Sequence, residues 1–230
     1  MILLHIETST SVCSVAASEN GTLLMQKINT EGMNHAKLLS VFIAEIIDYL
    51  TSLDKKIDAV SLSRGPGSYT GIRIGTATAK GLCFGYDVPL IAVDTLQVMA
   101  TSAREKIEKL QNNDLLCPMI DARRMEVYDE IFSANLSSVE AVKADIIDEN
   151  SFAEQLENQK MFFFGDGSDK CKEVITHPNA VFVPHVCPEA KYMIALAESK
   201  FTAKEFEDIA YFDPLYLKEF QATTPKKKLF

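Results

Sequence analysis

The sequence predicts an α/β protein built from two related lobes. Segments with strand character alternate along the chain with amphipathic helices. The pattern at the start of the chain recurs from residue 115 onward. No low-complexity linker separates the halves, so two lobes packed across a cleft are expected rather than two independent domains. We place an N-terminal lobe at residues 1–108 and a C-terminal lobe at 109–230, with the last helices of the latter packing back on the former.

The first half supplies strands and helices in alternation. Residues 1–28 hold the apolar runs ILLHI, CSVAA and TLLMQKI between short polar turns, which predicts an antiparallel hairpin or meander. Residues 35–50 place apolar side chains three and four positions apart, which predicts an amphipathic helix. The same criteria predict a strand at 57–63, a helix at 71–86, a strand at 87–94 and a helix at 95–111.

The second half begins with a copy of the first strand pair. The run LLCPMIDARRMEVYDEIFS mirrors ILLHIETSTSVCSVAAS, and in each an apolar strand ends in isoleucine and an acid before a return strand. This indicates an internal duplication. Further on, 161–168 reads as a strand ending in a Gly-Asp-Gly turn, and 188–201 as a helix. The closing TTPKKKLF, with Lys226 to Lys228, is typical of a solvated terminus.

Composition narrows the function classes. The 230 residues are 47% hydrophobic, which suits a globular core. Lys and Arg number 23 against 32 Asp and Glu, so the net charge of −9 disfavours a stand-alone nucleic-acid binder. The N-terminus lacks the pattern of a secretory signal, and no long uncharged apolar run predicts a membrane span, so a cytoplasmic protein is expected.

Cysteine and histidine spacing gives no metal motif. The five cysteines form no C-x-x-C pair, which is typical of reduced thiols. The four histidines never fall three or four residues apart, so no helix presents two of them on one face. A zinc hydrolase is therefore disfavoured.

The segment SRGPGSYTGIRIG at 63–75 resembles a phosphate loop in composition only. It lacks the G-x-x-x-x-G-K-[ST] pattern of a P-loop and the G-x-G-x-x-G pattern of a dinucleotide-binding turn. We expect a tight turn at Gly65-Pro66-Gly67, with Ser68 or Thr70 capping the next helix. Binding of an anion at that helix start remains a weaker alternative.

A row of small residues continues from this loop into the helix. Gly67, Gly71, Gly75 and Ala79 recur every fourth position and would leave one helix face nearly without side chains. A glycine inside a helix costs about 1 kcal/mol relative to alanine, so close packing must offset the cost. The row faces either the chain's own fold or a partner, and periodicity does not separate these two interpretations.

Several segments together resemble one family over nearly the whole chain. IETST, GPGSYTGIRIGTATAKGL, DVPLIAVDTL, MIDARRMEVY and DPLYLK are similar to the TsaB family, also called YeaZ. The resemblance implies the actin-like ATPase fold, related to the ribonuclease H fold, with a mixed sheet flanked by helices in each lobe. It also implies a role in the bacterial machinery that makes N6-threonylcarbamoyladenosine in tRNAs reading codons that begin with A.

The resemblance also implies where a nucleotide would bind. The superfamily places phosphate loops at strand turns that correspond to weak candidates here: Glu7, Thr8, Ser9, Asp121, Gly165 and Gly167. Glu7 stands where aspartate is usual, and Asp121 is followed by Ala-Arg rather than a glycine-rich turn. We therefore expect no intrinsic cofactor, with ATP or ADP bound at most at the interface of a complex.

Comparison with the related TsaD group implies a non-catalytic role. TsaD carries an H-x-x-x-H metal pair after a strand like PLIAV, and the corresponding positions here are Thr95 and Met99. Without metal ligands such a protein cannot polarise its substrate. The implied partners are a TsaD-like catalytic subunit and a TsaE-like ATPase, with a homodimer when the chain is alone and tRNA bound only through the complex.

Under this interpretation the docking surface combines the glycine-row helix with the helix at 35–50. Candidate contacts are Tyr69, Gly71, Ile72, Arg73, Gly75, Thr76, Ala79, His35, Leu38, Leu39 and Phe42. Arg73 could instead form an internal salt bridge, and a lone histidine such as His35 is more often a packing residue than a ligand. Two enzyme hypotheses compete: a small-molecule kinase or ATPase of the same superfamily, and a glycopeptidase, which the missing histidine pair disfavours.

Overall fold

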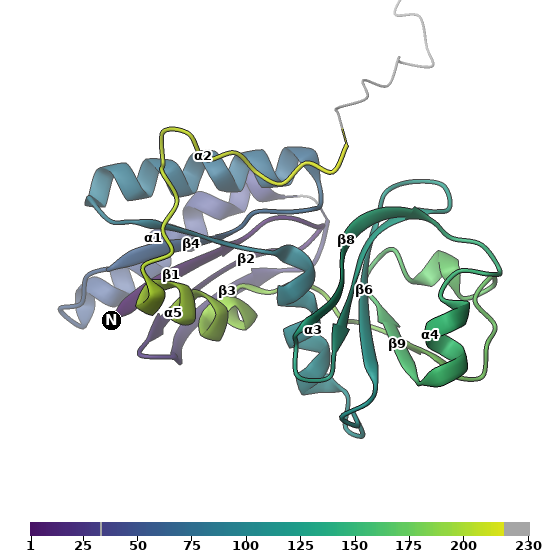
Figure 1. The fold of residues 1–230 in the computed structure, drawn as a ribbon. Helices are drawn as coiled ribbons and strands as arrows, with labels where there is room; N and C mark the ends of the chain where they lie inside the picture. The colour runs from purple at the N-terminus through teal and green to yellow at the C-terminus, as the bar shows by residue number, and fades with distance from the viewer. Residues whose placement is uncertain (33, 219–230) are drawn as a thin grey trace, which may run out of the picture.

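The chain folds into two lobes that each contain a five-stranded mixed sheet (Figure 1). The computed structural model describes residues 1–32 and 34–218, so the tail with Lys226 to Lys228 lies outside the described residues. The first sheet has the order β3-β2-β1-β4-β5, from β1 (Ile2–Glu7), β2 (Cys13–Glu19), β3 (Thr22–Asn29), β4 (Ala59–Ser63) and β5 (Leu90–Val93). The second has the order β10-β9-β6-β7-β8, from β6 (Leu115–Asp121), β7 (Glu126–Ser133), β8 (Ser138–Ile146), β9 (Met161–Phe164) and β10 (Ala180–Val183).

The two sheets have the same topology. In the first, β1 runs antiparallel to β2 and parallel to β4; in the second, β6 runs antiparallel to β7 and parallel to β9. In each lobe the strand order is third, second, first, fourth, fifth. The predicted α/β class with two duplicated lobes is therefore confirmed.

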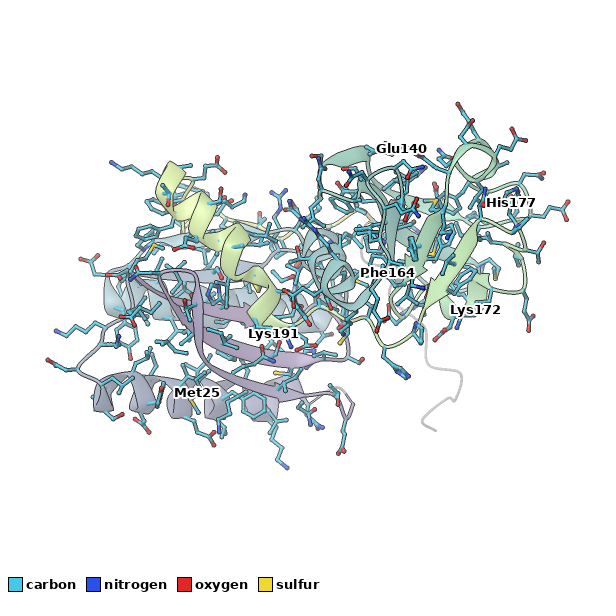
Figure 2. The ribbon with its side chains drawn as sticks, turned by 90° about the horizontal axis from the view of Figure 1, so that it is seen from below. Met25, Glu140, Phe164, Lys172, His177 and Lys191 are labelled. Atoms are coloured by element: carbon cyan, nitrogen blue, oxygen red, sulfur yellow. The ribbon has the colours of Figure 1, made fainter. Side chains whose placement is uncertain are left out.

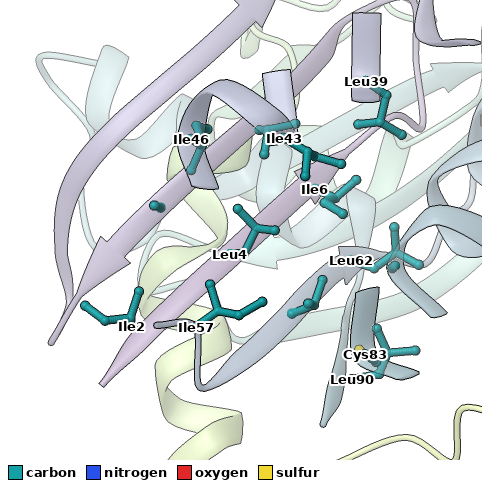
Figure 3. Packing of buried hydrophobic residues seen from close by; sticks show 14 of the residues in the cluster. Ile2, Leu4, Ile6, Leu39, Ile43, Ile46, Ile57, Leu62, Cys83 and Leu90 are labelled. Carbon is teal, nitrogen blue, oxygen red and sulfur yellow. The ribbon is translucent and has the colours of Figure 1, made fainter. Parts of the chain in front are cut away.

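Two helices cover one face of the first sheet. α1 (His35–Ser52) and α2 (Tyr69–Tyr86) pack on the side chains that alternate along β1 at positions 2, 4 and 6. Figure 3 shows this core, in which Leu39 and Ile46 of α1 meet Leu4 and Ile6. The spacing of apolar residues in α1 thus predicted its buried face correctly.

The opposite face of the first sheet is covered by the C-terminal end of the chain. The short 3₁₀ helix η2 (Ala190–Met193) and α5 (Ile194–Ala203) pack against the first sheet, where Met193 joins a cluster with Leu3 and Ile91. Lys191 lies where η2 meets the first lobe (Figure 2), and its backbone N–H donates to Gln26 Oε1 at 3.1 Å. The second half of the chain therefore completes the first lobe.

The second sheet is covered by α3 (Thr95–Lys106) on one face and by α4 (Ala153–Asn158) and the 3₁₀ turn η1 (Asp169–Cys171) on the other. α3 lies between the two lobes in Figure 1. No helix in the described ranges is long and apolar enough to cross a membrane.

Element bounds differ from the predicted ones where local signals compete. α3 ends at Lys106 rather than near residue 111, and the predicted helix at 188–201 begins as the 3₁₀ turn η2. α2 begins at Tyr69 because the Ser68 hydroxyl accepts the Gly71 N–H at 3.3 Å, which confirms Ser68 as the cap. The edge strands β8 and β10 and the short α4 were not predicted, since their sequence periodicity is weak.

Candidate functional site

The turn after β1 is buried and internally hydrogen-bonded. Glu7, Thr8 and Ser9 are fully buried. The Glu7 Oε1 atom accepts the Ser9 backbone N–H at 2.6 Å and also the Ser9 hydroxyl. Burial raises the pKa of Glu7, and Oε2 has no hydrogen-bond partner among the described residues. These three candidate nucleotide residues therefore face the protein interior.

The glycine-rich loop closes over this turn. The Ser68 N–H donates to the Ser9 carbonyl oxygen at 2.6 Å, and Thr8 Oγ1 donates to the Gly71 carbonyl oxygen at 2.8 Å. A Cβ atom on Gly67 would lie 2.2 Å from the Ser9 carbonyl oxygen, and one on Gly71 would lie 2.2 Å from the Thr8 carbonyl oxygen. Glycine is required because backbone meets backbone here.

The glycine row faces inward along the whole helix. A Cβ atom on Gly75 would lie 2.3 Å from Thr8 Oγ1, and Ala79 is fully buried in the first core. The prediction that Gly71, Gly75 and Ala79 contact a partner is therefore wrong, and the alternative of packing inside the chain's own fold is confirmed. The physical reason is that the β1–β2 turn occupies the space that the missing side chains leave.

Other predicted contacts are buried for the same reason. The His35 ring packs against Gly71, and its Nε2 donates to the Thr10 carbonyl oxygen at 2.7 Å. Further predicted docking residues that are buried within the lobe are Leu39, Ile72 and Thr76. The remaining predicted contacts keep surface area: Arg73 is exposed, and Tyr69, Leu38 and Phe42 are half-buried.

A second small-residue row, which sequence reasoning missed, lies on the outward face of α2. Ala77, Gly81 and Gly85 follow Arg73 at every fourth position, and all four residues are exposed. A Cβ atom on Gly81 or Gly85 would meet no described residue within 4 Å. Phe84, on the same helix, is 82% exposed. The sequence does contain this pattern, because Ala77, Gly81 and Gly85 lie four residues apart. The row that begins at Gly67 is more regular and drew the interpretation to itself.

The turn after β6 is more open than the turn after β1. Asp121 is exposed and pairs with Lys170. Asp166 Oδ1 accepts the Asp121 N–H at 3.1 Å. Gly165 and Gly167 lie against the backbone of β6, since a Cβ atom on Gly165 would be 2.3 Å from the Met119 carbonyl oxygen. Gly165 and Gly167 therefore allow the turn after β9 to pack closely on β6.

A cavity of about 240 Å³ lies between elements of the two lobes. Its lining combines polar groups of the β1–β2 turn with the β9–η1 and β10–η2 loops: Thr10, Ser11, Val12, Met99, Gly165, Asp166, Ser168, Asp169, Val183, Pro184, His185, Val186, Cys187 and Pro188. Of the six nucleotide candidates, Gly165 alone belongs to this lining. Among the described residues, neither lysine nor arginine is part of this lining, so none of their ammonium or guanidinium groups is placed there to hold a polyphosphate.

The two positions at which the resemblance places metal ligands are both buried in this chain. Thr95 is fully buried, and its Oγ1 lies 2.6 Å from the Ser63 hydroxyl. Met99 is fully buried and packs against Gly165. Thr95 is thus tied to β4 of the first sheet, whereas Met99 packs into the core of the second lobe and lines the cavity.

Two lobes that share one mixed-sheet topology, with a cavity between them, are the architecture of the actin-like ATPase fold. The family model described as "TsaD: tRNA N6-adenosine threonylcarbamoyltransferase" matches residues 29–226. The tRNA threonylcarbamoyladenosine biosynthesis protein TsaB of Haemophilus influenzae is 30% identical over 95% of this chain and 94% of its own length. The chain belongs to the TsaB family of tRNA threonylcarbamoyladenosine biosynthesis proteins.

Further relatives agree with this assignment. The Escherichia coli TsaB protein is 35% identical over 56% of this chain and 53% of its own length. The structure titled YeaZ from Pseudomonas aeruginosa matches with a TM-score of 0.74 and 26% identity, covering 94% of this chain and 99% of that one. A second Pseudomonas aeruginosa structure, titled as similar to peptidase YEAZ, gives a TM-score of 0.77 at 26% identity with the same coverage.

Proposed function

We propose that this chain is a non-catalytic subunit that a TsaD-type transferase requires to form N6-threonylcarbamoyladenosine in tRNAs reading codons that begin with A. The observation that carries the proposal is the role of Thr95 and Met99. The resemblance to the transferase group places its metal-binding histidines at these two positions, and here both are buried packing residues. A TsaE-like ATPase and tRNA join through the complex, and a second copy of the chain takes the docking surface when the transferase is absent.

The outward face of α2 is the surface that best fits a partner. Phe84 is a large aromatic that is mostly exposed, and exposed aromatic residues are enriched at protein interfaces. Ala77, Gly81 and Gly85 beside it would let another helix approach closely. Val41 of α1 is 47% exposed and adds apolar area from the neighbouring helix.

Reconstitution tests the proposed function. The transferase with its other partners is expected to form threonylcarbamoyladenosine in tRNA only when this chain is present, and this chain alone is expected to form none. Product formation at an equal rate without this chain would overturn the proposal. So would product formation by this chain alone.

A bulky residue on the outward face of α2 is expected to block docking without unfolding the chain. Gly81→Leu projects a side chain into open space, so the lobe keeps its packing while a partner helix is pushed away. We expect the dissociation constant for the transferase to rise at least tenfold, which corresponds to about 1.4 kcal/mol. Calorimetric titration measures it, and circular dichroism confirms the fold.

The matched control is Ala195→Leu, which makes a similar change at an exposed position of α5. It should leave the affinity for the transferase unchanged. Equal affinities of the wild type and Gly81→Leu would show that the partner docks elsewhere.

A kinase or ATPase remains the second candidate, because the cavity between the lobes carries hydroxyl and carboxylate groups. The described lining, which holds neither lysine nor arginine, and the closed turn at Glu7 favour the subunit role instead. Titration of the isolated chain with ATP and magnesium is expected to show no binding at millimolar concentration. Saturable binding together with ATP hydrolysis would favour the enzyme.

A further inference from the structure

Arg73 lies between two tyrosines at the start of the outward face of α2. Its guanidinium carbon is 4.2 Å from the centre of the Tyr69 ring and 6.0 Å from that of Tyr216, and its Nε donates to the Tyr216 hydroxyl at 3.2 Å. The two tyrosine rings also contact each other, with centres 5.3 Å apart. These three residues, which we call the arginine cluster, join α2 to a segment 143 positions later in the chain.

The segment that carries Tyr216 is anchored on both sides. Phe212 is buried in the first core beside α2, and the Leu215 N–H donates to the Arg64 carbonyl oxygen at 2.8 Å. Lys218 forms an ion pair with Glu126 of the second lobe. Residues 212–218 therefore form a strap that crosses the glycine-rich loop, and Tyr216 is held in place between its anchors.

This arrangement leaves the outer edge of the Arg73 guanidinium accessible to a partner. Stacking on Tyr69 covers one face of the group, and the bond to Tyr216 engages Nε. Arg73 forms no ion pair within residues 1–32 and 34–218, and Asp213 is near enough to contribute a favourable charge interaction. The two terminal amino groups can make the parallel hydrogen bonds by which arginine binds carboxylate or phosphate.

The charge of α2 indicates which anion fits. Arg73 and Lys80 are the charged residues of this helix, and both are positive in a chain of net charge −9. With 3.6 residues per turn, Arg73, Lys80 and Phe84 fall on one helix face. A cation, a row of small residues and an exposed aromatic together match an apolar helix with a carboxylate near one end. An RNA backbone would instead meet an acidic protein with few cations on this face.

We infer that Arg73, positioned by Tyr69 and Tyr216, binds a carboxylate on the docking helix of the transferase and fixes the register of that helix along α2. The inference rests on the proposed function. It assigns the C-terminal strap a part in docking, because Tyr216 orients the arginine while Phe212 and Lys218 hold Tyr216. Tyr216 is a positioning residue, since it acts through Arg73.

Binding of the purified transferase to variants tests the inference. Arg73→Ala is expected to raise the dissociation constant at least tenfold, and Arg73→Lys is expected to restore less than half of the lost free energy, because lysine cannot make the paired bonds. Tyr216→Phe removes only the hydroxyl and should raise the constant two- to fivefold. It should have no further effect in the Arg73→Ala background, which a merely structural role would not predict.

Tyr211→Phe is the matched control, because Tyr211 precedes the strap and is 85% exposed. It should bind like the wild type, and urea unfolding should be unchanged in all these variants. If the wild-type chain itself did not bind the transferase, that result would contradict the proposed function and not this inference alone. Wild-type affinity in Arg73→Ala would overturn the inference. So would a variant that binds the transferase normally while the complex loses affinity for tRNA, since that would assign Arg73 to RNA.

Discussion

An alanine at Gly71 is expected to lower the free energy of unfolding by about 3 kcal/mol, although alanine is the better helix former. The added methyl group would lie 2.2 Å from the Thr8 carbonyl oxygen and 2.9 Å from the His35 ring. To relieve this steric clash, α2 must move away from the β1–β2 turn. That movement breaks the hydrogen bond from Thr8 Oγ1 to the Gly71 carbonyl oxygen. Urea unfolding followed by circular dichroism measures the change.

Gly81→Ala is the matched control at an exposed position of the same helix. Its methyl group would meet nothing within 4 Å, so only the gain in helix propensity remains, and stability should rise by about 0.5–1 kcal/mol. Gly75→Leu should prevent folding of the first lobe, because Thr8 and Leu62 fill the space beside Gly75. Equal effects of alanine at Gly71 and Gly81 would mean that the inward row is not packed as described.

The second large effect is expected at Asp129, an acid buried in the second lobe. Asp129 lies two positions from both Val127 and Ile131 on β7, so it shares their face of the strand. Those two residues belong to the core, and Asp129 is itself fully buried. Neither carboxylate oxygen has a hydrogen-bond partner among the described residues. Burial, followed by the charge of Asp145, raises the pKa of Asp129 from 3.8 to about 7, while Lys143 acts in the opposite direction.

The raised pKa gives a defined pH dependence. The folded state holds the proton of Asp129 more tightly than the unfolded state, so the contribution of this group to stability is greatest below about pH 4 and is lost as the pH rises through 7. Full ionisation would cost roughly 4 kcal/mol. Asp129→Asn, which cannot ionise but keeps a buried amide, should be about 2 kcal/mol more stable than the wild type at pH 8 and nearly equal to it at pH 5.

Urea unfolding at pH 5, 6, 7 and 8 measures this difference. Glu149→Gln serves as the control, because it removes an exposed acid near the same lobe. Its stability profile should run parallel to that of the wild type. Parallel profiles for Asp129→Asn as well would show that Asp129 does not titrate in this range.

Local patterns predicted the fold because each element carries its own signal. The repeated isoleucine-acid turn at Glu7 and Asp121 predicted the duplication, and the two sheets share one strand order. The family motifs predicted the TsaB family, which the relatives confirm. The row at Gly71 and Gly75 correctly predicted close packing, but its partner was assigned to another chain.

Sequence periodicity could not predict what packs against the glycine row, for a geometric reason. It tells which residues share a helix face but not what covers that face. α2 has small residues at a spacing of four on both sides, one row through Gly71 and Gly75 and another through Ala77 and Gly81. The contacts that separate them come from distant segments, because Thr8 fills the first row and the second stays open.

The sequence by itself determined the α/β class, the duplication, the amphipathic α1 and the need for glycine where α2 begins, because these follow from spacing within a few residues. Tertiary structure alone decided which face of α2 is buried, that α5 completes the first lobe, and that Tyr216 reaches Arg73. Those contacts join residues far apart in the chain, and their geometry is fixed only when the sheets, helices and strap pack together.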